Sequence, residues 1–148
     1  MGIERDVKGL LESSAKETSP AFLGILNNAI METQPNGEDI LYFSGKYVGS
    51  GIMKARPKVG EKGIPLLIKN VLERIGIGSI TGVELKGDRF FLKIGSCPFR
   101  KSGPRGSCKF VQGMLMGMIS HASDRTYRMK GVTCKKTKNS HCIFEFAR

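Results

Sequence analysis

Four cysteines are the residues of this chain best suited to chemistry, and all four lie in its second half. Ten residues separate Cys97 from Cys108 and seven separate Cys134 from Cys142, with 25 residues between the two pairs. This is not the Cys-x2-Cys spacing of a zinc ribbon. Four thiolates brought together by folding would nevertheless hold one zinc ion in a closed tetrahedral site, about 2.3 Å from each sulfur. The alternative is four unrelated buried cysteines.

The positive charge is confined to the same half of the chain. Residues 1–84 carry equal numbers of basic and acidic residues, whereas residues 85–148 account for the whole net charge of +11. Basic residues around the cysteines would offset the negative charge of zinc-bound thiolates. A reactive thiol at Cys134, beside Lys135 and Lys136, has no identifiable acid–base partner, and no nucleophile, base or cofactor pattern stands out elsewhere. We therefore expect a protein that is not an enzyme.

A basic loop precedes the most apolar segment of the chain. Because backbone N–H groups at a helix start favour anions, the loop and the start of the following helix form a candidate anion site. It would take a carboxylate, a phosphate or a nucleic-acid backbone, and the alternative is a solvated basic face. The candidate residues are Arg100, Lys101, Arg105 and Lys109.

Apolar periodicity and turn residues predict the elements that position these groups. Helices are expected from Ser19-Pro20 to about residue 33, over 38–53, over 64–75 and over 107–121, the last capped by Ser107. Strands are expected over 79–85 and 88–95, turning at Lys86-Gly87, and over 126–134 and 142–147. The helix over 38–53 is expected to present one stripe of Ile40, Ser44, Tyr47, Val48 and Gly51. The order predicts an α+β fold with one antiparallel sheet of two hairpins, packed against about four helices.

These elements bring the cysteines toward one another. Cys134 and Cys142 flank the turn of the last hairpin, where paired residues face each other. Cys108 begins the helix over 107–121, and Cys97 follows the first hairpin. Placement at element ends therefore favours one shared metal site.

The helix over 107–121 is apolar nearly all round, which predicts that it is internal. Its methionines fit a core, and they also fit an adaptable hydrophobic pocket. Gly113 and Gly117, with Gly45, Gly49 and Gly51, would allow another backbone or a ligand to approach closely. We expect a ligand cavity lined by the helices over 20–33, 38–53 and 107–121. Its candidate residues are Phe22, Leu26, Phe43, Tyr47, Phe110, Met114, Gly117 and Met118.

Two segments resemble the 4-vinyl reductase domain family, most clearly within residues 64–148. They are Ser107-Cys-Lys-Phe-Val-Gln-Gly-Met-Leu-Met-Gly and Cys134-Lys-Lys-Thr-Lys-Asn-Ser-His-Cys142-Ile-Phe. The resemblance implies an α+β fold akin to subunits of the TRAPP vesicle-tethering complex. It also implies binding of small hydrophobic or aromatic (hydrocarbon) ligands, since the family includes sensor domains of phenol-responsive regulators, which bind zinc and form homodimers.

The resemblance also implies zinc ligands at Cys108, Cys134 and Cys142. The family's fourth ligand, a glutamate, falls on Gly131, which cannot bind a metal. Cys97 is the natural replacement, which would make a four-cysteine site without an open position for catalysis.

The chain is expected to form one domain over 1–148, with N-terminal helices over 1–76 and the zinc-bearing half over 77–148. No apolar run approaches the roughly 20 residues of a membrane span, and no signal peptide is recognisable. We expect a cytoplasmic, non-catalytic binding or sensing protein for a small hydrophobic molecule, with structural zinc. The alternative is a basic nucleic-acid-associated zinc protein.

Overall fold

The computed structural model describes residues 29–56, 58–76, 79–95, 108–123, 125–135 and 141–148. For Cys134 and Lys135 it describes the backbone. The predicted helix start at Ser19-Pro20 therefore lies outside the described residues. The predicted helix end agrees with the structure, because residues 29–33 are helical and are followed by the turn at Pro35-Asn36.

The four strands form one antiparallel sheet of two hairpins, as predicted. They are β1 (Ser79–Lys86), β2 (Arg89–Gly95), β3 (Arg128–Lys135) and β4 (His141–Ala147), in the spatial order β1-β2-β4-β3. The first turn lies at Gly87-Asp88, one residue later than predicted. Gly87 has φ +58°, a conformation that suits glycine, which explains why the turn centres there.

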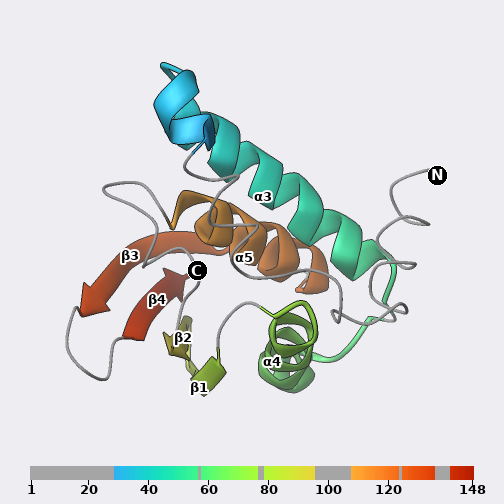
Figure 1. The fold of residues 1–148 in the computed structure, drawn as a ribbon. Coiled ribbons are helices and arrows are strands. Elements are labelled where there is room, and N and C mark those ends of the chain that lie inside the picture. The colour runs from blue at the N-terminus through green and yellow to red at the C-terminus, as the bar shows by residue number, and fades with distance from the viewer. Residues whose placement is uncertain (1–28, 57, 77–78, 96–107, 124, 136–140) are drawn as a thin grey trace.

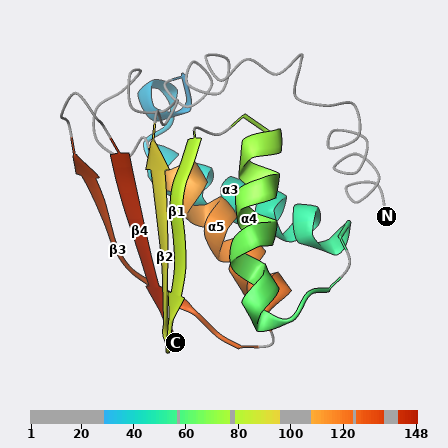
Figure 2. The same ribbon diagram turned by 90° about the horizontal axis from the view of Figure 1, so that it is seen from below.

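The longer helices lie on one face of this sheet (Figures 1 and 2). They are α3 (Gly37–Lys54), α4 (Ile64–Arg74) and α5 (Lys109–Ala122), with a short 3-10 helix η1 (Glu61–Gly63) before α4. Helix α5 lies between α3 and the sheet, and α4 packs beside β1 (Figure 1). The predicted α+β architecture is thus confirmed.

Helix α5 is internal, as its apolar circumference predicts. Residues from Val111 to Ile119 are buried with the single exception of Gln112, and they join the inward residues of the sheet in one core. The N-cap is Cys108, one residue later than the predicted cap at Ser107, and it makes no side-chain capping hydrogen bond. The sheet contributes Ile80, Phe90, Leu92, Ile94, Cys142, Phe144 and Phe146 to this core.

The stripe predicted for α3 does not coincide with the face that is buried, although Gly51 belongs to both. Ser44 and Tyr47 are exposed, whereas the buried positions are Leu41, Gly45, Gly49, Gly51, Ile52 and Met53, along with Gly37. The physical reason is the contact with α5, which is made backbone to backbone. A Cβ built at Gly45 or Gly49 would collide with the carbonyl oxygen of Phe110 or Met114, respectively.

Helix α4 follows the predicted periodicity closely. Ile64, Ile68, Val71 and Leu72 are buried, Pro65 lies in the first turn, and Gly76 adopts φ +75° just past the helix end. Such a left-handed residue commonly ends a helix. In the segment before α4, Glu61–Gly63 forms the short helix η1.

Candidate metal and ligand sites

The register of the last hairpin places two of the four cysteines opposite each other. Cys134 in β3 pairs with Cys142 in β4, and Cys142 pairs on its other side with Ile94 in β2. Opposed residues of antiparallel strands have Cα atoms about 4.5–5.5 Å apart. The Cys142 side chain is fully buried on the inner face of the sheet. The predicted juxtaposition of these two positions is therefore present.

Cys108 lies at the same end of the domain. It is the buried N-cap residue of α5 and belongs to the same core cluster as Cys142. In both views the first turn of α5 lies toward the end of the sheet where β3 ends and β4 begins (Figures 1 and 2). A helix N-terminus favours negative charge, which suits a thiolate at this position.

The fourth cysteine of the predicted zinc site lies outside the described residues. Cys97 follows Gly95 by two positions in the sequence, and Gly95 pairs with His141, the neighbour of Cys142. Within the part of the chain that the structure describes, no group of three or more His, Cys, Asp or Glu side chains is placed to hold a metal ion.

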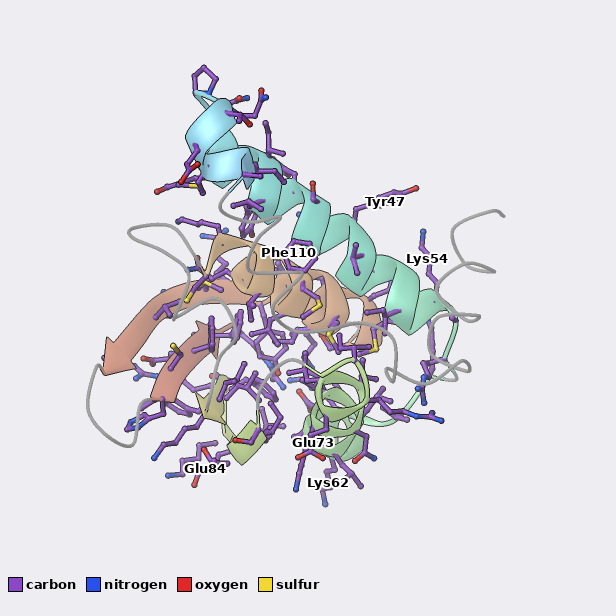
Figure 3. The ribbon with its side chains drawn as sticks, in the orientation of Figure 1. Tyr47, Lys54, Lys62, Glu73, Glu84 and Phe110 are labelled. Atoms are coloured by element: carbon purple, nitrogen blue, oxygen red, sulfur yellow. The ribbon has the colours of Figure 1, made fainter. Side chains whose placement is uncertain are left out.

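The residues predicted to line one ligand cavity do not lie together. Phe22 and Leu26 are outside the described residues. Met114, Gly117 and Met118 are buried in α5, whereas Phe43 and Tyr47 are 64% and 63% exposed on the far side of α3. Figure 3 shows Tyr47 projecting away from α5, whereas Phe110 lies between the two helices.

The contact between α3 and α5 explains this separation. A Cβ built at Gly113 or Gly117 would collide with the backbone carbonyl of Tyr42 or Lys46, respectively. The glycines that were expected to admit either a backbone or a ligand therefore admit a backbone. The exposed side chains of Phe43 and Tyr47 take no part in this backbone contact.

The predicted anion site falls mostly on residues that are not described. Arg100, Lys101 and Arg105 lie outside the described residues, and Lys109 is half-buried as the first residue of α5. No geometry for this site follows from the described residues.

An open groove of about 310 Å³ lies between α4 and β1. Its volume is at the lower end of the range of small-molecule sites. Leu66 is 63% exposed at its rim, and Lys69 supplies a cation. Sequence reasoning missed this groove, although Leu66 gives a signal: it is apolar but falls off the buried stripe of α4. The lining residues are Pro65, Leu66, Lys69, Ile80, Thr81, Gly82 and Val83.

Comparisons with known proteins return no family model that matches the chain and no curated protein similar to it. Among the described residues, none of the helices combines the length and the apolar character that a membrane crossing requires.

Proposed function

We propose that this chain is a non-catalytic binding domain for a small hydrophobic molecule, held together by a structural zinc ion on Cys97, Cys108, Cys134 and Cys142. The observation that carries the zinc proposal is the pairing of Cys134 with the fully buried Cys142, at the end of the sheet toward which the first turn of α5 lies (Figure 2). Thiolate ligands stay reduced in the cytoplasm, which is the compartment we propose.

Zinc at this position would supply folding free energy rather than chemistry. A closed four-cysteine site has no open coordination position, and its ion would join β3 and β4 to the start of α5. Cysteine thiolates are soft ligands that suit zinc. The ligand-binding half of the proposal is supported by the resemblance to the 4-vinyl reductase domain family.

The groove between α4 and β1 is the place we propose for the ligand. Leu66, Ile80 and Val83 offer apolar contacts, and the Lys69 ammonium would pair with a carboxylate on the ligand. A medium-chain fatty acid or an aromatic acid has this combination of groups.

A homodimer is the assembly we propose, through the outer face of α3. Phe43 and Tyr47 form its exposed centre, with the acidic Asp39 toward one end and Lys54 at the other. Two copies of α3 packed antiparallel would bring Asp39 of each beside Lys54 of the other, while the aromatic rings meet in the middle. The face is therefore complementary to itself.

Native mass spectrometry of the untagged protein, with a denatured spectrum beside it, tests these statements together. We expect one zinc per chain in a dimer, with the zinc lost in Cys134→Ser and Cys142→Ser. Thr133→Ser is the matched control, because Thr133 is the exposed neighbour of Cys134 in β3. A metal-free chain with four thiols, or one lighter by two hydrogen atoms through a disulfide, would contradict the zinc site.

Thermal unfolding with decanoate or benzoate tests the ligand site separately. We expect both to raise the melting temperature of the zinc-loaded protein, and Lys69→Gln to weaken this effect at least several-fold. Lys62→Gln is the matched control, since Lys62 is exposed in η1 and does not line the groove. An equal shift in both variants would exclude the groove as the binding site.

A further inference from the structure

The outer face of the sheet is a second surface with a distinct chemical character. The longer helices lie on the opposite face, so this face is uncovered by them (Figures 1 and 2). Side chains alternate between the faces of a strand, and paired residues on neighbouring strands share a face. Because Phe90, Leu92 and Ile94 point into the core, Arg89, Phe91 and Lys93 belong to the outer face.

Cations dominate this face. Lys86 pairs with Arg89 across the first hairpin, Arg89 pairs with Ala147, and Ala147 pairs with Arg128, which makes one row across the sheet. Lys93 lies in a second row with Ile143 and Thr133. Lys130 is exposed at the irregularity between Met129 and Gly131.

The carboxylates of this face are already engaged. Glu84 forms an ion pair with Lys86, in which Oε2 lies 2.9 Å from Nζ. Glu145 forms one with Arg89, in which Oε1 lies 3.1 Å from Nη1. Figure 3 shows Glu84 projecting from β1 away from the helices. Lys93, Arg128 and Lys130 have no ion pair with another described residue. The outer face therefore keeps an excess of positive charge.

One aromatic ring lies among these charges. Phe91 is half-buried between Glu84 and Glu145 in the register, two residues from Arg89 and from Lys93. Nucleic-acid bases stack on aromatic rings whatever their sequence, while lysines and arginines contact the phosphates. An open antiparallel sheet with an accessible ring is a surface on which unpaired bases can lie flat.

We infer that the outer face of the sheet binds single-stranded nucleic acid. Lys93, Arg128 and Lys130 contact phosphates, and Phe91 stacks against a base. The cations of this face lie on three strands, which fits an extended polyanion. It carries little apolar surface for insertion into a lipid bilayer, which favours nucleic acid over an anionic membrane.

Fluorescence anisotropy with labelled oligo(U) and oligo(dT) of about 20 nucleotides, over about 50 to 200 mM salt, tests this inference. The test variant is Lys93→Gln/Arg128→Gln/Lys130→Gln. The matched control, Lys58→Gln/Lys62→Gln/Arg74→Gln, removes the same charge from exposed residues of α4 and of the segment before it. We expect the wild type and the control to bind alike and the test variant to lose at least tenfold in affinity. Its salt slope should fall by about 2, because each lost phosphate contact on a single strand removes about 0.7.

The variant Phe91→Leu distinguishes binding through this face of the sheet from non-specific attraction between the cations and any nucleic acid. This variant should lose several-fold in affinity for the single strands and change little toward a duplex of equal length, because duplex bases are not open to stacking. The two oligonucleotides also show whether RNA or DNA is preferred. Equal losses in the test and control triple variants, no effect of Phe91→Leu, or binding to phosphatidylserine vesicles without binding to oligonucleotides would each overturn the inference. Far-UV circular dichroism confirms that every variant is folded.

Discussion

Tyr127 is the centre of a polar cluster that ties three distant parts of the chain together. Its hydroxyl donates to Glu61 Oε1 at 3.3 Å and accepts from Arg148 Nε at 3.3 Å. The Arg148 guanidinium also pairs with Glu61 and with Asp88, and it lies 5.6 Å from the centroid of the Tyr127 ring. The buried phenol thereby joins the segment before β3 to η1 and to Arg148 after β4, and Arg148 in turn pairs with Asp88 in the turn of the first hairpin.

This cluster predicts a loss of stability at alkaline pH. Burial raises the pKa of Tyr127 above its ordinary value of 10.0, Asp88 raises it further, and Arg125 lowers it. The folded protein therefore holds the phenol proton more tightly than the unfolded chain does. The stabilisation is complete below about pH 10 and is lost as the pH rises through the folded-state pKa.

Urea unfolding at about pH 8 and about pH 11 measures this effect, and Tyr127→Phe should reduce the alkaline loss. At about pH 8 the same substitution should cost on the order of 1 to 3 kcal/mol, because it removes hydrogen bonds to charged groups. Tyr47→Phe is the control, since Tyr47 is 63% exposed. An identical pH dependence in wild type and Tyr127→Phe would show that Tyr127 does not contribute.

At the scale of elements, the contact between α3 and α5 depends on glycines on both helices. Gly117→Ala adds a methyl group that meets the backbone carbonyl of Lys46. Alanine favours a helix by about 1 kcal/mol over glycine. We nevertheless expect a net destabilisation of about 1 to 3 kcal/mol, because two packed backbones cannot separate without disturbing the core.

Gly60→Ala serves as the matched control for Gly117→Ala. Gly60 is exposed, has φ −63°, and has no atom within 4 Å of a built Cβ. Alanine there should raise the free energy of unfolding by about 0.4 to 1 kcal/mol, because it reduces the conformational entropy of the unfolded chain. The midpoint of urea unfolding, followed by circular dichroism, measures both variants. If Gly117→Ala were neutral or stabilising, the backbone contact would not be as close as described.

The order of elements could be predicted because each one carries its own local signal. The stripe of α4, the alternation of β2 and the apolar circumference of α5 all follow from short-range periodicity. The face of α3 could not be obtained in this way, because its closest contact with α5 is made by glycines, whereas the aromatic side chains of Phe43 and Tyr47 are exposed. The equal four-residue spacing of Gly45 and Gly49 with Gly113 and Gly117 was the informative signal.

The candidate sites show the same division between local and distant contacts. The opposition of Cys134 and Cys142 could be predicted, since both flank one hairpin turn. The position of Cys108 relative to them depends on how α5 packs on the sheet, which no local pattern encodes. The groove between α4 and β1 likewise lies between two elements, beside the irregularity of β1 between Ile80 and Gly82.

For the molecule as a whole, the net charge of +11 destabilises the folded state, because folding brings like charges closer together. Two like charges about 10 Å apart in water repel by about 0.4 kcal/mol, and salt screens this repulsion over about 10 Å at 0.1 M. Lys93, Arg128 and Lys130 gather on one sheet face without acidic partners among the described residues. They therefore contribute to this repulsion.

The triple variant Lys93→Gln/Arg128→Gln/Lys130→Gln should consequently be more stable than the wild type at low salt, by about 1 kcal/mol. The difference should shrink as NaCl screens the charges, and urea unfolding at low and high NaCl measures it. If these cations bind a polyanion, this variant loses binding while it gains stability, so the lost affinity does not come from misfolding. A variant less stable than the wild type at low salt would show that the three side chains support the fold instead, through contacts other than ion pairs.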